Sequence, residues 1–370
     1  MSPSSTCRRA GTSNNRPVRM KLGLNLGYWG IGPQGEEALE IVRAAEAAGF
    51  DSVWAAESYG SDVVSVLAWL APQTETIQLG AAIMQVPARA PAAAAMAGCT
   101  IDALSGGRFI FGFGPSGPQV SEGWYGVPYP KPWGRTREYV EIVRKIVARE
   151  DRLEHQGKHF TLPLPDGEGK ALKLNFHPVR NHIPIFLGAI GRRSVEITAE
   201  IADGWIPIFS SPDAFRETWD EHVEVGLEKG GRSRSDLEIS PTVQVAIDGD
   251  LDAARGIVKA GLLLYLGGMG SRKTNFYVDL THRFGFGEVA DEVQSLYLDG
   301  KREEAFAAIP DELVDATALV GSEDEVADRL KAYEGAGVDR LIISPISPEP
   351  DQRLHTVKRL AERAGVGAAA

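Results

Sequence analysis

The sequence contains few of the residues from which disulfide or metal scaffolds are built. Only Cys7 and Cys99 are cysteines among 370 residues, so neither a disulfide framework nor a cluster of paired cysteine ligands is available. The seven histidines include no His-Glu-x-x-His pattern. Four of them lie between residues 155 and 182, where we expect exposed loop positions. We therefore predict no metal site and a reducing, cytoplasmic location.

Long apolar runs and excess positive charge are also missing. The most apolar stretch, residues 79–104, is interrupted by Arg89, whereas a membrane-spanning helix needs roughly 18 or more consecutive apolar residues. The formal net charge is -11, which disfavours a surface that binds nucleic-acid phosphates. No Gly-x-Ser-x-Gly elbow lies between a strand and a helix, which disfavours acyl-transfer hydrolysis. We predict a small-molecule partner, with neither nucleic acid nor membrane.

Short β-rich runs alternate with longer helical patterns along the chain, which is typical of parallel strands joined by crossover helices. Eight strands are predicted, at 21–26, 51–55, 77–83, 108–113, 184–188, 204–208, 238–247 and 339–344. The pattern of helix, Ala-Gly, apolar residue, Asp and strand occurs near both ends of the chain. We therefore predict an α/β fold, a (β/α)8 TIM barrel formed by residues 20–370 as a single domain.

Two segments exceed a minimal barrel, residues 151–183 and 267–320, and we interpret them as insertions at the carboxyl face of the strands. The Gly-rich residues 267–276 are expected to form a mobile loop. Residues 1–19 are expected to be a disordered extension, and Met20 is a plausible natural start. A doubly wound sheet is the structural alternative, but Tyr28 and Trp29 stand where its glycine-rich turn would approach a pyrophosphate.

Small residues follow several of the predicted strands. Between 79 and 91 they leave room for a flat ring against the backbone, although a tightly packed strand end explains them equally well. Glycines at 112, 114 and 117 either leave one strand face open to a ligand or relieve crowding in a narrow barrel. Residues 187–194, with Arg192 and Arg193 at the start of a helix, suit a phosphate; the alternative is an ordinary turn with two solvated arginines.

Six short stretches, in this order and spacing, resemble one enzyme family. They are Ser-Val-Trp-Ala-Ala-Glu-Ser at 52–58, Leu-Gly-Ala-Ala-Ile at 79–83, Leu-Ser-Gly-Gly-Arg-Phe at 104–109, Gly-Phe-Gly-Pro-Ser-Gly-Pro-Gln-Val at 112–120, Ala-Asp-Gly-Trp at 202–205 and Tyr-Leu-Gly-Gly-Met-Gly at 265–270. The sequence is similar from about Met20 to about Leu360 to the coenzyme F420-dependent branch of the luciferase-like oxidoreductases. The resemblance implies a barrel with inserted segments that holds a deazaflavin across its strand ends.

The resemblance also implies roles for particular residues. A non-prolyl cis peptide at Ala82-Ile83 would press on the ring of F420, or of FMN as the alternative cofactor. Sequence patterns and the resemblance together imply further cofactor-binding residues. They are Gly114, Ser116, Gly117, Ser121, Gly188, Ala189, Ile190, Gly191 and Arg192. The catalytic candidates are Glu57 and Ser58, where sugar-phosphate dehydrogenases of the family carry an Asp-His pair. Serine is no base at neutral pH without a partner, which places a sugar-phosphate substrate in doubt.

The favoured hypothesis is an F420-dependent oxidoreductase that moves hydride between C5 of the deazaflavin and a small organic substrate. Tyr28, Trp29, Trp124 and Tyr125 are expected on the substrate side. Three roles are open for Glu57: it acts as an acid, orients the ring, or forms a salt bridge to a neighbour such as Arg89 or Arg108. One alternative is an FMN-dependent monooxygenase, and another is a cofactor carrier without catalytic activity. We expect a homodimer, with the Ala-rich helices near 62–72 and 90–103 as its interface.

Overall fold

The computed structural model describes residues 20–30, 32–270 and 275–366, so the predicted extension at 1–19 lies outside the described residues. The strands are β1 (Lys21–Tyr28), β2 (Ser52–Ala56), β3 (Gln78–Ala81), β4 (Met84–Gln85), β5 (Phe109–Gly114), β6 (His155–Gln156), β7 (Thr161–Leu162), β8 (Ile185–Leu187), β9 (Gly204–Trp205), β10 (Glu238–Ile239), β11 (Thr242–Ile247), β12 (Ala318–Gly321) and β13 (Arg340–Pro345).

The helices alternate with these strands. They are α1 (Gly35–Ala47), α2 (Val63–Leu70), α3 (Pro91–Leu104), α4 (Pro118–Gly123), α5 (Pro132–Ala148), α6 (Arg192–Ile201), α7 (Phe215–Gly230), α8 (Leu251–Leu263), α9 (Phe276–Arg283), α10 (Gly287–Leu298), α11 (Arg302–Ala307), α12 (Asp311–Thr317), α13 (Glu323–Gly335) and α14 (Pro350–Ala364). A π-helical turn, η4 (Leu264–Gly268), follows α8 directly.

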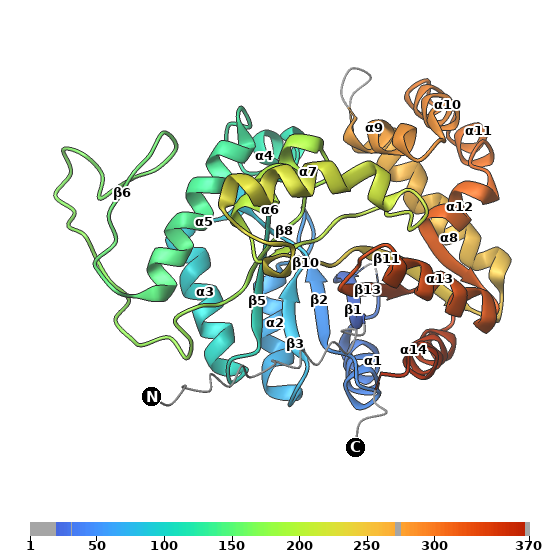
Figure 1. Ribbon diagram of the computed structural model, residues 1–370, viewed down its shortest axis with the longest axis horizontal. Helices are drawn as coiled ribbons and strands as arrows, with labels where there is room; N and C mark the ends of the chain where they lie inside the picture. Colours follow the sequence, from blue (N-terminus) through green and yellow to red (C-terminus); the bar gives the residue numbers. More distant parts are fainter. Residues whose placement is uncertain (1–19, 31, 271–274, 367–370) are drawn as a thin grey trace, which may run out of the picture.

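The main sheet is parallel and has the strand order β10-β9-β8-β5-β3-β2-β1-β13-β11-β12, with β4 paired to β5. It curls, and the helices lie outside it (Figure 1). Helix α1 illustrates why the helices lie against the sheet. It buries Leu39, Ile41 and Val42 on one face and exposes its charged face, as an amphipathic helix packed on a sheet does. The chain is therefore an α/β protein with a curled, mostly parallel sheet.

Each of the eight predicted strand segments contains a strand. Two differ from the prediction: β9 ends at Trp205, and the segment 238–247 is divided into β10 and β11. The division falls at Ser240-Pro241, where proline has no N–H to donate to a neighbouring strand. Strand β12 was not predicted; it pairs in parallel with β11 through residues 318–321.

Inward-facing side chains fill the space inside the curled sheet, between the amino and the carboxyl ends of its strands. The central cluster consists of Trp54, Ile110, Phe186, Ile206 and Ile342, with Ala82 and Ile83 packed against it. At the amino ends of the strands, Arg340 is 1% exposed and its guanidinium lies over Trp54, 5.6 Å from the ring centroid. The interior is thus a packed core, and any ligand space lies at the carboxyl ends of the strands.

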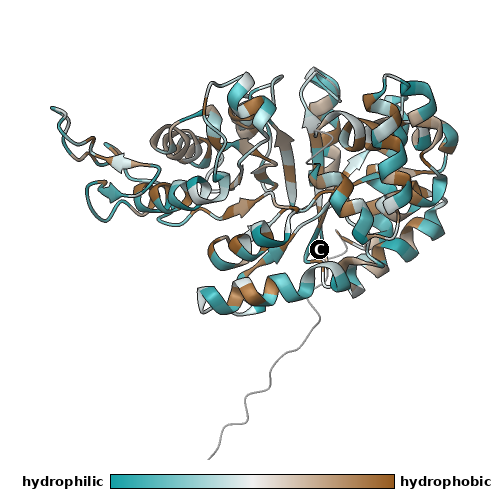
Figure 2. Ribbon diagram, turned by 90° about the horizontal axis from the view of Figure 1, so that it is seen from above, coloured by the Kyte–Doolittle hydropathy of each residue, from teal (hydrophilic) through white to brown (hydrophobic). Residues whose placement is uncertain are grey.

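The first predicted insertion, residues 151–183, projects from the body as an arm that carries the antiparallel hairpin β6–β7 (Figures 1 and 2). The expectation that all its histidines are exposed is wrong for His155, which is 5% exposed. It lies against Glu138 of α5, whose carboxylate also accepts the backbone N–H groups of residues 158, 159 and 160 at 2.9 to 3.0 Å. The histidine is buried because it helps to fasten the arm to α5.

The second predicted insertion, residues 267–320, is largely helical and contains α9 to α12. The expected mobile loop at 267–276 is wrong for its two ends, because Gly267 belongs to η4 and Phe276 begins α9. Residues 271–274 lie outside the described residues. A Cβ on Gly267 would lie 2.2 Å from the Tyr297 ring of α10, so glycine here permits close packing of η4 against α10.

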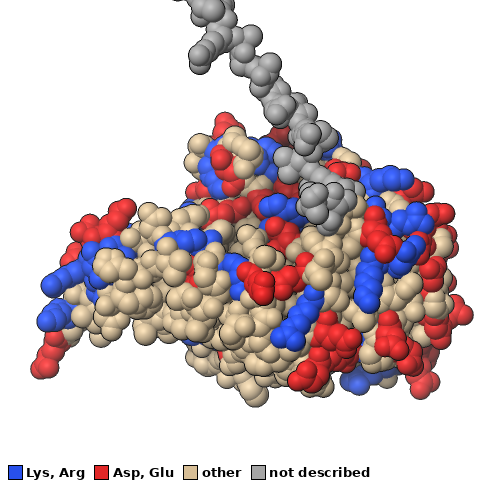
Figure 3. Space-filling view, turned by 90° about the horizontal axis from the view of Figure 1, so that it is seen from below, with Lys and Arg blue, Asp and Glu red and all other residues tan. Residues whose placement is uncertain are grey.

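The distribution of charged side chains can be followed on one face of the molecule. On the face shown in Figure 3, acidic and basic side chains are interspersed rather than gathered into one basic patch. Among the described residues, no helix is both long and apolar enough to cross a bilayer.

Candidate functional site

The carboxyl end of β3 is shaped by an unusual peptide bond. The bond between Ala82 and Ile83 is cis, which confirms the geometry that the family resemblance implied. Both residues are partly exposed above the central cluster. They therefore lie where a ring across the strand ends would rest.

Ile83 occupies a space that two glycines provide. A Cβ on Gly114 would lie 2.0 Å from Ile83 Cδ1, and a Cβ on Gly188 would lie 3.2 Å from Ile83 Cγ2. Similarly, a Cβ on Gly112 would lie 1.7 Å from the carbonyl oxygen of Ala81. These contacts account for the absence of side chains at Gly112 and Gly114 by close packing, because protein atoms fill the space beside them.

Glu57, directly after β2, is held in place by Arg89. The Arg89 guanidinium donates to both carboxylate oxygens of Glu57 at 3.0 and 2.7 Å and to Asp62 at 2.7 Å, and Gln85 N donates to Glu57 at 3.0 Å. Burial opposes the charge on Arg89, but the bonds to Glu57 and the charges of Glu57 and Asp62 raise its pKa above the usual value. Glu57 is 4% exposed. Because it is bound by both Arg89 and the Gln85 N–H, it anchors the loops after β2 and β4.

Arg108, the other partner considered for Glu57, binds elsewhere. Its guanidinium donates to the carbonyl oxygens of four residues, Ala71, Thr74, Ile77 and Ser105. Arg108 therefore fastens the turn before β3 and does not contribute to the strand-end site.

Gln85 links the Glu57 anchor to the loop after β5. Its side-chain amide donates to Ser116 Oγ at 2.8 Å, while its Oε1 is buried without a hydrogen-bond partner in the described structure. Ser116 has a left-handed backbone, with φ of 62°. Ser58 is half-buried, and its carbonyl oxygen accepts the Tyr125 hydroxyl at 3.5 Å. Sequence reasoning placed Ser116 and Ser58 correctly at this end of the sheet but overlooked Gln85.

The loop after β5 is closed by Ser121. Its hydroxyl donates to the carbonyl oxygen of Val127 at 2.8 Å, its N–H donates to Gly117, and its side chain is 2% exposed. Gly117 precedes α4, a short helix. Ser121 shapes the loop that carries Ser116, and its hydroxyl is already used within that loop.

The turn into α6 has the features of an anion site. Ala189 is buried and accepts the Trp205 indole N–H at 2.8 Å, while Ile190 and Gly191 are half-buried. Gly191 caps α6 and exchanges hydrogen bonds with the Ser194 hydroxyl. The first residue of the helix, Arg192, has an exposed side chain. Unpaired amides at a helix start and a neighbouring cation favour an anion.

Arg283, at the end of α9, adds a second cation that sequence reasoning missed. Burial, and then the charge of Arg192, lower its pKa below the usual value for arginine. Its Nη1 is buried and has no partner among the residues that the structure describes, and its guanidinium lies 5.3 Å from the Trp219 ring centroid. Arg283 lies 91 positions after Arg192, so only the fold brings the two together.

Aromatic side chains border the site on the side of α9. Phe209, Tyr265 and Tyr277, here called the aromatic cluster, have ring centroids 4.7 to 5.7 Å apart. Tyr28, at the end of β1, lies near Tyr265 and Tyr59. Burial is the largest cause that raises the pKa values of Tyr28 and Tyr265. Both therefore remain protonated around neutral pH.

The four aromatic residues expected on the substrate side have different surroundings. Trp29 packs edge-on against Trp69 at 5.4 Å, and Trp124 is 65% exposed. Tyr125 contacts the loop after β2 through Ser58. Tyr28 is the one that lies near the aromatic cluster.

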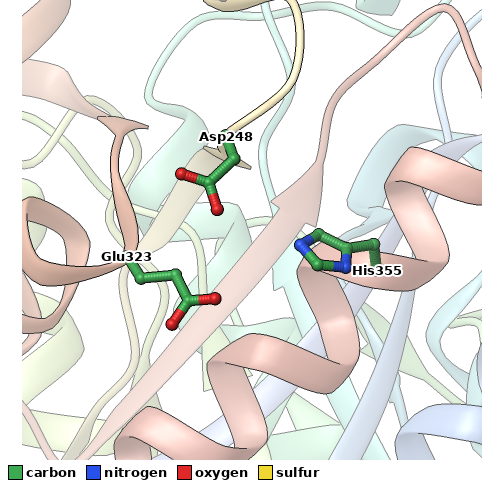
Figure 4. A group of neighbouring side chains, drawn as sticks. All are labelled: Asp248, Glu323 and His355. Carbon is green, nitrogen blue, oxygen red and sulfur yellow. The ribbon is translucent and has the colours of Figure 1, made fainter.

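One group of potential metal ligands occurs among the described residues, Asp248, Glu323 and His355 (Figure 4). Their ligand atoms lie within 4.8 Å of one another. The Glu323 carboxylate, however, is already bound by Arg359 and Arg363, and its pKa is lowered to about 2, chiefly by the bond to Arg359. We interpret the group as part of an ion-pair network.

A family model confirms what the motifs implied. The model for luciferase-like monooxygenases matches residues 20–340. The chain belongs to the luciferase-like monooxygenase family. Within this family, Rv3520c of Mycobacterium tuberculosis, provisionally named a coenzyme F420-dependent oxidoreductase, is 48% identical over 89% of the chain and 96% of its own length.

Two further proteins to which the chain is similar carry related names. A 5,10-methylenetetrahydromethanopterin reductase of Archaeoglobus fulgidus is 30% identical over 85% of the chain and 92% of its own length. The solved structure of the coenzyme F420-dependent tetrahydromethanopterin reductase of Methanopyrus kandleri superposes with a TM-score of 0.77, at 24% identity, over 93% of the chain and 98% of that structure. The superposition supports the luciferase-like fold.

Proposed function

We propose that this luciferase-like protein is an F420-dependent oxidoreductase that transfers hydride between C5 of the deazaflavin and a small organic substrate. The observation that carries the proposal is the arrangement of the strand ends: Ile83 is partly exposed beside Gly114 and Gly188, and α6 begins at Arg192, four residues after Gly188. A flat ring and its phosphate need these two features side by side. The F420-dependent names of relatives at 48% identity and below support the choice of cofactor.

The ring side of the site fits a flavin-like group. The Gln85 Oε1 atom is a buried acceptor without a partner in the described structure, beside Ser116. An unpaired buried acceptor is costly unless a ligand satisfies it. The N–H on the pyrimidine edge of a deazaflavin or flavin is a donor of the required kind. We propose that Ala82, Ile83, Ser116 and Gln85 hold the ring.

The phosphate side of the site fits an anionic group. Arg283 Nη1 has no partner among the described residues, and the charge of Arg192 opposes that of Arg283. Two cations held together are stabilised by an anion between them. The residues we propose for the phosphate are Ala189, Ile190, Gly191, Arg192 and Arg283, with Gly117 and the loop closed by Ser121 on the opposite side.

When bound, the deazaflavin supplies or accepts the hydride. The protein's own residues hold the loops around the site in position. Arg89 fixes Glu57, Glu57 fixes the Gln85 backbone, and Gln85 fixes Ser116. Both oxygens of Glu57 are engaged in this chain of bonds, which supports a positioning role for it. Ser58, beside it, is left to contact the substrate.

We also propose that the sheet closes as a (β/α)8 barrel with inserted segments. Segment 238–247 pairs with β9 through β10 and with β13 through β11. Across the interruption, Thr242 N donates to the carbonyl oxygen of Pro207 and Ile342 N donates to that of Pro241. These bonds connect the two ends of the curled sheet through a single stretch of chain.

Binding measurements with the two cofactors test the proposal. Tryptophan fluorescence is followed while the purified protein is titrated separately with F420 and with FMN. We expect tight binding of F420, and tenfold or greater weakening in Arg283→Met, because a charge-assisted hydrogen bond contributes about 1.5 to 3 kcal/mol. Arg216→Met, an exposed arginine on α7, is the matched control. Tight FMN binding without any response to F420 would instead support the monooxygenase alternative.

The carrier alternative needs a kinetic test, because Glu57 is held by Arg89 and Ser58 has no obvious activating partner. Bound reduced F420 is mixed in a stopped-flow instrument with a panel of enones, imines and aldehydes. We expect faster oxidation of the cofactor by at least one class. No acceleration across the panel would favour a carrier.

A further inference from the structure

The aromatic cluster brings together rings from three separate parts of the chain. Phe209 belongs to the loop after β9, Tyr265 to the π-helical turn η4 and Tyr277 to α9. Each pair of rings meets at an interplanar angle between 64° and 90°, the edge-to-face arrangement that aromatic rings prefer. All three side chains are partly exposed. The rings therefore form one ordered surface that a ligand can reach.

The backbone of Phe209 is left-handed, with φ of 52°. A bulky residue rarely adopts this conformation, and the surrounding structure must then enforce it. The Phe209 ring packs against two hydrophobic clusters at once, one that contains Trp205 and Trp219 and one that contains Leu266 and Val278. Glycine or asparagine adopts a left-handed backbone more easily. Phenylalanine at this position therefore indicates that the ring itself is required.

The backbones of the two tyrosines are fixed by one buried side chain. Asn275, which is 5% exposed, donates to the carbonyl oxygens of Tyr265 at 3.2 Å and Leu266 at 2.7 Å. Its Oδ1 atom accepts the backbone N–H of Tyr277 at 2.9 Å. Asn275 thus joins η4 to the start of α9. π-Helical turns are rare and occur frequently at functional sites, so this connection favours a role in ligand recognition.

The aromatic cluster lies at the same end of the sheet as the proposed cofactor site. Phe209 comes three residues after Ile206, which belongs to the central cluster against which Ala82 and Ile83 pack. Phe209 and Ile190, the latter from the turn into α6, also pack against one common hydrophobic cluster. The rings are therefore neighbours of both the proposed ring site and the proposed phosphate site.

The two tyrosines approach the strand ends from the side opposite to the loops that we propose to hold the ring. Those loops follow β3, β4 and β5, whereas η4 and α9 come after β11 and α8. In the sheet, β11 is separated from β3 by β13, β1 and β2. The side of the site that the ring-holding loops leave open is thus the side of the aromatic cluster, where a substrate would lie.

We propose that Phe209, Tyr265 and Tyr277 recognise the substrate, and that the substrate is a flat aromatic or conjugated compound; this rests on the proposed hydride transfer. A flat ring makes stacked or edge-to-face contacts with aromatic side chains, which a puckered saturated ring does not. Because the fold orders the three rings before a ligand arrives, binding requires little further ordering of the protein. The cluster thereby selects substrates by the flatness of the group next to the reacting carbon.

A matched pair of probes tests this selection without any cofactor. Acetophenone and cyclohexyl methyl ketone share a carbonyl group and the number of carbon atoms, but only acetophenone is flat. Titrations followed by saturation-transfer NMR give both dissociation constants. We expect acetophenone to bind about fivefold more tightly, and Tyr277→Leu to remove the difference. Phe276→Leu, the matched control, changes a neighbouring residue of α9 that is 47% exposed and should retain the difference. Equal affinities for the wild type, or no binding of either ketone, would overturn the proposal.

Two further variants separate recognition from folding. Phe209→Asn accepts the left-handed backbone and should fold, bind F420 as the wild type does, and lose the preference for acetophenone. Asn275→Asp keeps the acceptor that caps α9 but loses both donor bonds to η4, so its preference should be reduced. Loss of F420 binding in Phe209→Asn with the ketone preference retained would assign the cluster to the cofactor and overturn the proposal. Absence of F420 binding in the wild type overturns the proposed function instead, and the ketone titrations still decide the role of the cluster.

Discussion

At the scale of single residues, the strand-end site is packed so closely that its glycines have no room for a side chain. Gly114 is the clearest case, because the position of its missing Cβ is taken by Ile83. The glycine pattern along β5 was visible in the sequence, but whether ligand or protein fills the space depends on a side chain 31 positions earlier. Local pattern does not contain that information.

Gly114→Ala is therefore expected to displace Ile83. Overpacking of this kind costs about 1 to 3 kcal/mol, and the moved Ile83 should also weaken F420 binding. Thermal unfolding and fluorescence titration measure the two effects. Gly256→Ala in α8 is the control, because a Cβ there meets nothing within 4 Å and alanine favours a helix. Equal stability of the two variants would contradict the packing role.

Arg89 provides a second prediction at this scale. Arg89→Met leaves the Glu57 carboxylate, which is 4% exposed, without its cation, and removing one partner of a buried pair costs about 3 to 5 kcal/mol. Arg152→Met, at an exposed arginine within the arm, should cost little. Chemical denaturation of Arg89→Met, Glu57→Gln and the double variant gives the coupling energy. A coupling near zero would show that the pair does not act as a unit.

At the scale of elements, the arm over residues 151–183 is fastened to α5 by Glu138. Burial works against the carboxylate, but the N–H groups of His159, Lys158 and Phe160 lower its pKa. Such a group stabilises the fold above its unfolded pKa, about 4.3, and its contribution disappears as the pH falls through the lower folded value.

Glu138→Gln should accordingly loosen the arm at pH 7, by about 1.5 kcal/mol, and the difference from wild type should shrink progressively as the pH is lowered below about 4.3. Hydrogen exchange at residues 158–160 measures the change along this pH series. Glu141→Gln is the control, since that carboxylate on the same helix is 52% exposed. A difference between wild type and Glu138→Gln that does not shrink as the pH falls would be inconsistent with the charged clamp.

Elements with strong periodicity were predicted well, and elements created by contact were not. Helix α1 and strands β1, β2 and β13 follow hydrophobic patterns in the sequence. Strand β12 is only four residues long, and its pairing with β11 joins segments about 70 positions apart. The same limit applies to the candidate site. The motifs found Ile83 and Arg192, whereas Arg283 reaches the site only through the folding of α8, η4 and α9.

At the scale of the whole molecule, the predicted homodimer can be tested on α2 and α3. Trp69, Met96 and Leu104 are 36%, 55% and 53% exposed, and exposed apolar side chains of this size favour an interface. Met96→Glu should convert a dimer into a monomer without unfolding it, as measured by sedimentation and circular dichroism. Leu298→Glu on α10, where Leu298 is 38% exposed, should remain dimeric. A wild-type monomer would contradict the prediction.

The pairing of β1 with β13 has a consequence for synthesis on the ribosome. Lys21 pairs with Arg340 and Leu24 with Ile343, so one edge of β1 has no partner until the last strand has been made. At roughly 5 to 20 residues per second, the nascent β1 waits on the order of half a minute. During that time its exposed edge is open to wrong partners, which gives chaperones that bind emerging chains a defined segment to protect.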